Sequence, residues 1–407
     1  MIEPSQYLLK GRNRNKKRIY ITLYIRTMQK EEIVINNIQK LYQSKKIYDL
    51  EGTERYFVAA IKDNMEFHNQ HCKRYAQILK KQGIIKDDIH SIEDLHRIPP
   101  LPTLYYKKKR IASLPSKKMV IKATASGTSG VKSKIGYDAK GLYYGAHMVY
   151  RIAKYHKLLS TKPTNYILLG FQQGKENQAV TAKTLLGSTY FAPAKERVYA
   201  LQYVNGSYEF NIKGMLKALM KFSKQSNPVR IIGFPAYALF LANELEKRKK
   251  RFTLPKGSKV ILGGGWKQFY SDRVDKKLLY QKIQRTLGIE EENIREFYGA
   301  VEHPMLYCDC KNHHFHVPIY SRVLVRDVDT LLPVPNGKVG ILNFLSPLLS
   351  SMPLTSVMTD DLGVLHNGAE CGCGITAPYF EVLGRVGLCD IHTCAWGAGE
   401  LLGGNRI

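Results

Sequence analysis

A short segment rich in hydroxyl groups, glycines and lysines follows the strand-like residues 119–121. It contains Ser126, Gly127, Thr128, Ser129, Gly130, Lys132 and Lys134. Glycines let backbone N–H groups converge on an anion, hydroxyl groups add donors, and lysines supply positive charge. Only two residues separate Gly127 from Gly130, so the segment is not a Walker loop. It indicates a phosphate-binding loop of another kind, although similar segments also serve as plain surface connectors.

Carboxylate, aromatic and arginine side chains occur in three later motifs. These are 296–302 with Tyr298, Gly299 and Glu302, 359–363 with Asp361, and 384–385 with Arg385. A carboxylate at the end of a strand can hold Mg²⁺ between ATP phosphates, and an aromatic ring can flank adenine. Taken in isolation, Tyr298 is more typical of a core residue and Glu302 of a surface residue.

The order and approximate spacing of these four motifs resemble those of the adenylate-forming enzymes, which join a carboxylic acid to AMP from ATP. Residues 98–102, 126–135 and 262–267 narrow the resemblance to particular families within this class of enzymes. From about Met28 to the C-terminus, the chain is similar to the acyl-protein synthetase family of the bacterial bioluminescence fatty-acid reductase system, and to phenylacetate-CoA-ligase-like proteins. The resemblance implies an α/β fold, with helix-covered, mostly parallel sheets and a small β-rich subdomain.

The resemblance also implies roles for individual residues. Asp361 would accept the ribose hydroxyl groups, although Asp360 stands where the family usually has glycine. Arg385 would hold the ribose and the α-phosphate as a forked donor. Only 22 of the 407 residues follow Arg385, so we expect the full C-terminal swinging domain, with its lysine, to be missing. Lys132, Lys134 and Lys267 are candidates to replace that positive charge.

A cysteine close to the C-terminus is the acyl acceptor that the resemblance implies. Cys394 has the expected spacing from Arg385, and His392 is near enough in sequence to take its proton. Cys389 is the competing candidate. Two buried structural thiols are the alternative explanation.

The cysteines are unevenly distributed, since six of the seven lie in the last hundred residues. Two Cys-x-Cys pairs, with histidines 313, 314 and 316 after the first, suit tetrahedral zinc. The pairs are Cys308 with Cys310 and Cys371 with Cys373. This spacing is tighter than the usual Cys-x₂-Cys, so incidental free thiols are the alternative. A comparable arrangement in phenylacetate-CoA-ligase-like proteins implies His316 as the nitrogen ligand, and leaves the choice between Cys308 and Cys310 open.

Composition limits the classes of protein and of partner. The chain is 44% hydrophobic and has no run of eighteen apolar residues, so it should not span a membrane. The net charge of +28 ordinarily indicates nucleic acid or an acidic membrane surface. However, the lysines are spread over several expected helices, and no nucleic-acid module is present. We therefore expect a solvated, lysine-rich surface that attracts ATP and acidic proteins, and a cytoplasmic location.

Apolar periodicity predicts three regions. Residues 1–27 form a basic extension that a mis-called start codon would explain. Residues 28–300 comprise two helices within 28–81 and a nucleotide- and acyl-binding part. In that part, strands near 166, 229 and 259 alternate with helices over 141–155, 212–224, 237–250 and 274–287, which is typical of a parallel sheet. Residues 301–407 form short strands, the cysteine-rich site and a tail.

These observations predict an ATP- and Mg²⁺-dependent enzyme that activates a carboxylic acid, most simply a fatty acid, to acyl-AMP. The acyl group would then pass to a cysteine, and from there to a reductase or acyltransferase partner. Apolar residues within 233–240 are candidates for the acyl pocket, or for an ordinary buried helix. Two alternatives stay open, an acyl- or aryl-CoA ligase and a basic, zinc-stapled binding protein without enzymatic activity.

Overall fold

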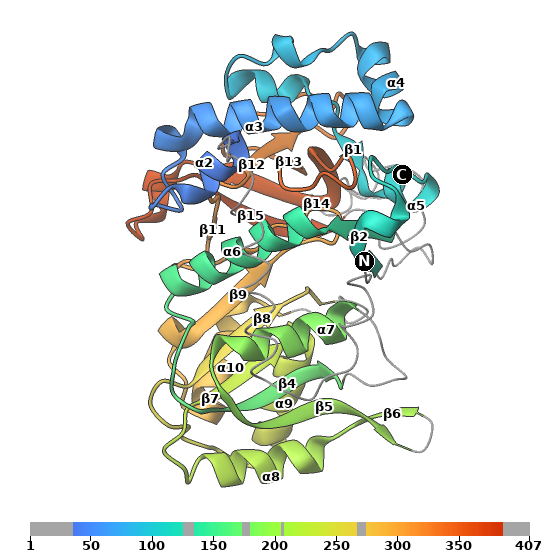
Figure 1. The fold of residues 1–407 in the computed structure, drawn as a ribbon. Helices are drawn as coiled ribbons and strands as arrows, with labels where there is room; N and C mark the ends of the chain where they lie inside the picture. Colours follow the sequence, from blue (N-terminus) through green and yellow to red (C-terminus); the bar gives the residue numbers. More distant parts are fainter. Residues whose placement is uncertain (1–35, 125–133, 173–179, 205–206, 267–273, 386–407) are drawn as a thin grey trace, which may run out of the picture.

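The computed structural model describes residues 36–124, 134–172, 180–204, 207–266 and 274–385, without the side chains of residues 180–183. Two large sheets stack one above the other, and the long helix α6 (Ala139–Tyr155) lies between them (Figure 1). The Asp138 carboxylate begins this helix by accepting a hydrogen bond from the Gly141 N–H at 3.1 Å.

The first sheet has seven strands and a parallel centre. Its order is β10 (Tyr307–Cys308), β9 (Ile294–Tyr298), β8 (Lys259–Gly263), β7 (Val229–Gly233), β4 (Thr164–Phe171), β5 (Ala194–Val204) and β6 (Ser207–Phe210). Strands β9 to β5 pair in parallel, and the two edge strands pair antiparallel. The central strands are nearly continuous apolar runs, as expected when helices cover both faces of a sheet. The predicted alternation of strands and helices is confirmed.

Four helices belong to this layer, and their bounds are α7 (Val180–Gly187), α8 (Ile212–Phe222), α9 (Pro235–Lys247) and α10 (Lys276–Leu287). Helices α8 to α10 begin and end close to where apolar periodicity places them. The long strand β5 and the edge strand β6 were not predicted, because β5 alternates charged and apolar residues without a clear boundary.

The second sheet has six strands and is mostly antiparallel. Its order is β11 (Phe315–His316), β15 (Tyr379–Arg385), β14 (Ser356–His366), β13 (Val339–Leu345) and β12 (Arg322–Arg326), with β1 (Leu101–Pro102) pairing parallel to β14. The predicted short strands after Gly299 are thus confirmed. A separate two-stranded hairpin is formed by β2 (Met119–Thr124) and β3 (Lys134–Asp138).

The N-terminal helices pack on this second sheet (Figure 1). The described residues contain three such helices, α2 (Asn37–Gln43), α3 (Leu50–His71) and α4 (Lys73–Gln82). The sequence predicted two helices in this region. Cys72 adopts an extended conformation, φ −134°, and separates α3 from α4. Phe57 and Ile61 of α3 share one core with Phe344 and Val357 of the sheet, so residues far apart in sequence form this layer together.

Short helices connect the larger elements. They are α5 (Thr103–Lys108), η2 (Lys86–Asp88), η3 (Glu93–Arg97), η4 (Ser116–Lys118), η5 (Ser188–Phe191), η7 (Glu291–Asn293) and η8 (Gly368–Cys371). Among the helices of the described residues, none combines the length and the apolar composition that a bilayer crossing requires.

Candidate active site and metal-binding cluster

Three of the sequence motifs meet at one place. The Tyr298 hydroxyl, at the end of β9, donates a hydrogen bond to Asp361 Oδ2 at 2.7 Å. The Nε of Arg385 lies 3.6 Å from Asp361 Oδ1, and the two residues are cross-strand partners on β14 and β15. A carboxylate held between a phenol and a guanidinium can present acceptors to a sugar while the guanidinium contacts a phosphate.

The Tyr298 side chain is anchored by other aromatic rings. Its ring centroid lies 5.4 to 6.0 Å from those of Tyr307, Phe315, Phe344 and Phe380. Burial and the neighbouring Asp361 carboxylate raise the pKa of Tyr298, so the phenol stays protonated and donates. In this arrangement the hydroxyl group reaches Asp361, and the predicted contact of the ring with adenine stays a prediction.

The two aspartates of the 359–363 motif face different neighbours. Asp360 Oδ1 accepts a hydrogen bond from the Thr103 hydroxyl at 3.1 Å, whereas Asp361 faces Tyr298 and Arg385. Successive residues of a strand point to opposite faces of the sheet, which explains the division. The preference for Asp361 agrees with this geometry.

Glu302 lies just beyond β9 and is 4% exposed. The Tyr137 hydroxyl of β3 donates to the Val301 carbonyl at 2.9 Å, and burial together with the Glu302 carboxylate raises the pKa of Tyr137. Strand β3 follows the predicted phosphate-binding loop in the sequence, and Tyr137 of this strand lies beside Val301 and Glu302. Gly299 sits between Tyr298 and Glu302 where a Cβ would come within 2.9 Å of the Met305 carbonyl, which restricts this position to glycine.

Several predicted site residues lie outside the described residues. They are Ser126, Gly127, Thr128, Ser129, Gly130, Lys132, Lys267, Cys389, His392 and Cys394. Lys134 is described, as the exposed first residue of β3. The roles expected for all of these residues stay predictions.

A second group of side chains meets where the segment after β10 of the seven-stranded sheet leads into β11 of the six-stranded sheet. The sulfur atoms of Cys310, Cys371 and Cys373 and a ring nitrogen of His316 all lie within 4.8 Å of one another. We call these four residues the Cys/His cluster. The His316 Nδ1–H donates to the Ala377 carbonyl at 2.7 Å, which leaves Nε2 facing the Cys373 sulfur at 3.2 Å. A hydrogen bond from the ring nitrogen that does not bind the metal fixes the tautomer of a metal-binding histidine.

The two cysteine turns of the cluster are alike. The Cys310 sulfur accepts a hydrogen bond from the Asn312 N–H at 3.3 Å, and the Cys373 sulfur accepts one from the Ile375 N–H at 3.4 Å. Gly372, at φ +68°, provides the left-handed backbone between Cys371 and Cys373. Burial, followed by the neighbouring thiols, raises the pKa of Cys371 to about 12, so a cation is needed to hold it as a thiolate at neutral pH. The donor set therefore fits a metal ion that accepts three sulfurs and one nitrogen.

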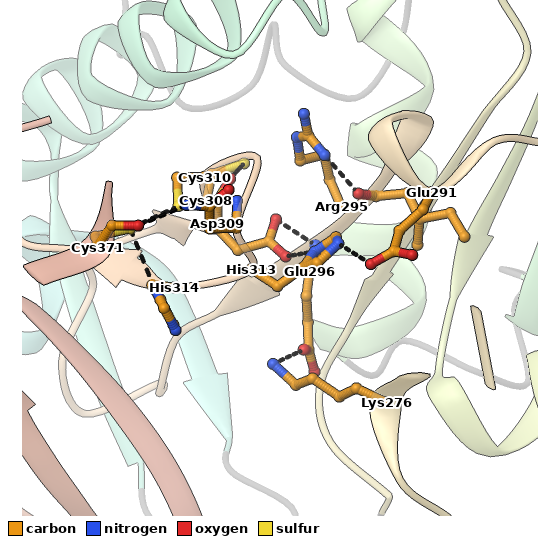
Figure 2. Close-up of polar contacts among 12 residues, drawn as sticks. Lys276, Glu291, Arg295, Glu296, Cys308, Asp309, Cys310, His313, His314 and Cys371 are labelled. Atoms are coloured by element: carbon orange, nitrogen blue, oxygen red, sulfur yellow. Dashed lines mark hydrogen bonds and ion pairs between the residues drawn. The ribbon is translucent and has the colours of Figure 1, made fainter. Parts of the chain in front are cut away.

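The structure brings Cys310 to the cluster and leaves Cys308 apart. Cys308 is fully buried on β10, opposite Phe297 of β9, and its thiol lies 3.6 Å from the Asp309 carbonyl. His314, one of the histidines considered from sequence, instead points its Nδ1 at the Cys371 sulfur from 3.1 Å (Figure 2). Cys308 therefore contributes to the core, and His314 adds a polar contact beside the four donor atoms.

Sequence reasoning missed a polar chain on the other side of Cys310. Asp309 is fully buried, and its carboxylate accepts hydrogen bonds from the Glu296 N–H at 2.8 Å and from His313 Nδ1 at 2.9 Å. Glu291 lies 3.3 Å from the opposite nitrogen of that ring (Figure 2). An acid between two cysteines, followed four residues later by histidine, was the available signal. These hydrogen bonds connect the segment that carries Cys308 and Cys310 to β9, the strand that carries Tyr298.

Comparison with known proteins identifies the family. A family model described as acyl-protein synthetase, LuxE, matches residues 24–402. The chain belongs to this family. The family expected from the motifs is confirmed, and with it an adenylate-forming ligase class.

Curated relatives and solved structures agree with this assignment. The chain is 24% identical over 313 residues to a long-chain-fatty-acid–luciferin-component ligase of Aliivibrio fischeri, covering 76% of this chain and 79% of that one. It is 25% identical over 335 residues to a phenylacetate-coenzyme A ligase of Thermus thermophilus, covering 77% and 65%. A 2-hydroxyisobutyryl-CoA ligase in the postadenylation state superimposes with a TM-score of 0.61 at 13% identity, covering 83% of this chain and 68% of that ligase. This likeness confirms the predicted α/β fold of the adenylate-forming enzymes.

Proposed function

We propose that this LuxE-family protein activates a long-chain fatty acid with ATP and then holds the acyl group as a thioester on Cys394. The fatty carboxylate attacks the α-phosphate and releases pyrophosphate, and the cysteine thiolate then attacks the acyl carbonyl and displaces AMP. The observation that carries the proposal is the meeting of Tyr298, Asp361 and Arg385 in a chain of this family.

The described residues support distinct parts of the first step. Asp361 would accept the ribose hydroxyl groups while Tyr298 holds its carboxylate in place, and Arg385 would contact the α-phosphate. Glu302 would bind Mg²⁺, whose charge would neutralise the phosphates of bound ATP. Positioning and charge neutralisation are the main sources of rate in such transfers.

The thioester is tested by labelling the full-length protein with radioactive fatty acid and ATP. We expect label that survives denaturing electrophoresis and is removed by hydroxylamine. Cys394→Ala should keep acid-dependent pyrophosphate exchange but lose the label, because adenylate formation does not need the thiol.

Cys389→Ala is the matched control, and it should keep both activities. Loss of label with Cys389→Ala, and its retention in Cys394→Ala, would transfer the role to Cys389. CoA consumption without protein label would instead favour the acyl-CoA ligase alternative, and no pyrophosphate exchange at all would favour the binding protein.

The Cys/His cluster supports a structural zinc ion. Two buried thiols, one partly buried thiol and an oriented imidazole match the closed donor sets in which Zn²⁺ has no open position for substrate. Bound zinc would fasten the hairpin after β10 to the loop before β15. A role in folding, and not in the reaction, follows from this placement.

The acyl group would then pass to a second protein, either a reductase or an acyltransferase. The name of the Aliivibrio fischeri relative speaks of ligation to a luciferin component, which suits transfer between proteins. Incubating the acylated protein with candidate partners and measuring the loss of label would identify the acceptor.

A further inference from the structure

One stretch of the chain is rich in cations and almost free of acids. Between Lys107 and Lys157 the sequence has 13 lysines and arginines but a single acidic residue, Asp138. That acid is 6% exposed, and its carboxylate accepts backbone hydrogen bonds from Gly141 and Ser351, both at 3.1 Å. Because the Asp138 carboxylate is buried and already accepts these hydrogen bonds, it does not neutralise the exposed cations of this stretch.

Six exposed cations of this stretch, together with two exposed aliphatic residues, form what we call the basic face. Its members are Lys108, Lys109, Arg110, Lys117, Lys118, Val120, Ile121 and Lys122. The elements that carry them are contiguous. Helix α5 contacts β3, η4 leads directly into β2, and β2 pairs with β3 (Figure 1). The Ser113 N–H donates to the Ser351 carbonyl at 2.9 Å, and the Ser351 hydroxyl donates to the Gly136 carbonyl, which joins the segment between α5 and η4 to the hairpin.

Some of the cations on the helices of the seven-stranded sheet are neutralised by acids. Lys221 pairs with Glu196 at 2.6 Å, and Lys282 pairs with Glu246 at 2.5 Å. None of the six basic-face cations forms an ion pair with another described residue. Their charge is therefore available to an external anion.

The apolar residues of the basic face are exposed by a local irregularity. The pairing register of β2 and β3 shifts between Met119 and Ile121, so that Val120 has no cross-strand partner. Val120 is 57% exposed and Ile121 is 46% exposed. Two adjacent aliphatic side chains on a basic edge are poorly explained by solvation alone.

We propose that the basic face binds the surface of an anionic phospholipid bilayer. The cations would attract the headgroups, while Val120 and Ile121 would enter the boundary between headgroups and acyl chains. Protein–protein interfaces are depleted in lysine and enriched in aromatic residues and arginine, whereas this face has five lysines, one arginine and no aromatic residue. Binding to duplex DNA relies on phosphate contacts and would not use the aliphatic pair.

Such binding would place β3 and the neighbouring Glu302 close to a source of long-chain acids. This consequence for the reaction rests on the proposed function, whereas the lipid contact itself does not. The test therefore measures binding in the absence of ATP and acid, so that it can fail independently of fatty-acid activation.

The experiment is co-sedimentation of the full-length protein with lipid vesicles. We expect binding to vesicles that contain phosphatidylglycerol, little binding to pure phosphatidylcholine, and weaker binding as salt increases. The triple change Lys108→Gln, Lys109→Gln and Arg110→Gln should lower the affinity for anionic vesicles at least about tenfold, since each cation near such a surface contributes about fivefold.

The matched control changes Lys247, Lys250 and Arg251 to Gln, which removes the same charge from the exposed last residue of α9 and the exposed segment after it. This control should bind within about twofold of the unmodified protein. Val120→Thr with Ile121→Thr should reduce binding several-fold while keeping the β-branched shape that suits a strand. Thermal unfolding of each variant verifies that it is folded.

Three outcomes would overturn the proposal. They are equal losses in the basic-face and control variants, equal binding to neutral and anionic vesicles, and no vesicle binding at low salt. Tighter binding to duplex DNA than to anionic vesicles at the same salt would assign the face to nucleic acid instead.

Discussion

The Cys/His cluster and the group of Tyr298, Asp361 and Arg385, which we call the Tyr298 site, lie at opposite ends of the same strand. Strand β15 begins at Tyr379, opposite His316, and ends at Arg385, opposite Asp361. The cluster is closed, because its donors are buried or nearly so and two of its sulfurs accept hydrogen bonds from their own turns. The Tyr298 site is open, since 41% of the Arg385 side chain is exposed.

This difference separates a site that holds the fold from a site that holds a ligand. Local turns with short-range hydrogen bonds position two cysteines of the cluster, and its donor atoms face one another inside the protein. The Tyr298 site brings a phenol, a carboxylate and a guanidinium together from β9, β14 and β15, and leaves part of the Arg385 side chain exposed. We therefore expect changes at the cluster to act on stability, and changes at the open site to act on activity.

Glu302→Gln should have the largest effect on activity. Removing one charge that stabilises phosphate at a site of this kind costs about 3 kcal/mol, so acid-dependent pyrophosphate exchange should fall about a hundredfold. Metal content and thermal unfolding should be unchanged, because glutamine keeps the shape of this buried side chain. Exchange at the rate of the unmodified protein would remove Glu302 from the site.

Cys373→Ser should act on the fold. The unmodified protein should contain about one equivalent of zinc per chain, and the variant should lose it. The free energy of unfolding, measured by chemical denaturation, should decrease by at least about 2 kcal/mol. Cys308→Ser is the informative comparison, because Cys308 lies outside the cluster and its replacement should leave the metal content unchanged. A metal-free protein of undiminished stability would contradict the structural zinc.

Tyr298→Phe should lower pyrophosphate exchange by about tenfold. The change removes a hydrogen bond to a charged carboxylate, worth about 1.5 kcal/mol, while the ring keeps its aromatic neighbours. Stability should change little. A variant with full exchange but reduced stability would show that this hydroxyl serves the core and not the orientation of Asp361.

Asp360→Asn should have the smallest effect, less than about twofold on exchange, because Asp360 faces Thr103. The same change at Asp361 should cost at least tenfold, since that carboxylate faces Tyr298 and Arg385. Equal effects at the two positions would place both aspartates at the nucleotide.

Sequence by itself determined the fold class, the family and the order of the motifs. Apolar periodicity is a local property, so helices such as α8 to α10 and buried strands such as β4 and β7 could be predicted. The paired cysteines likewise indicated a metal-binding group, because ligand types and short spacings are visible along the chain.

Tertiary structure decided which of these residues meet. It brought Cys310 and not Cys308 to the cluster, because Cys308 is held in β10 while Cys310 lies beyond the end of that strand. It packed Phe57 of α3 against the sheet formed by residues 322–385, and brought α5 into contact with β3 of the hairpin. These contacts depend on the path of the chain between distant residues, and the same spacing along a sequence is compatible with many such paths.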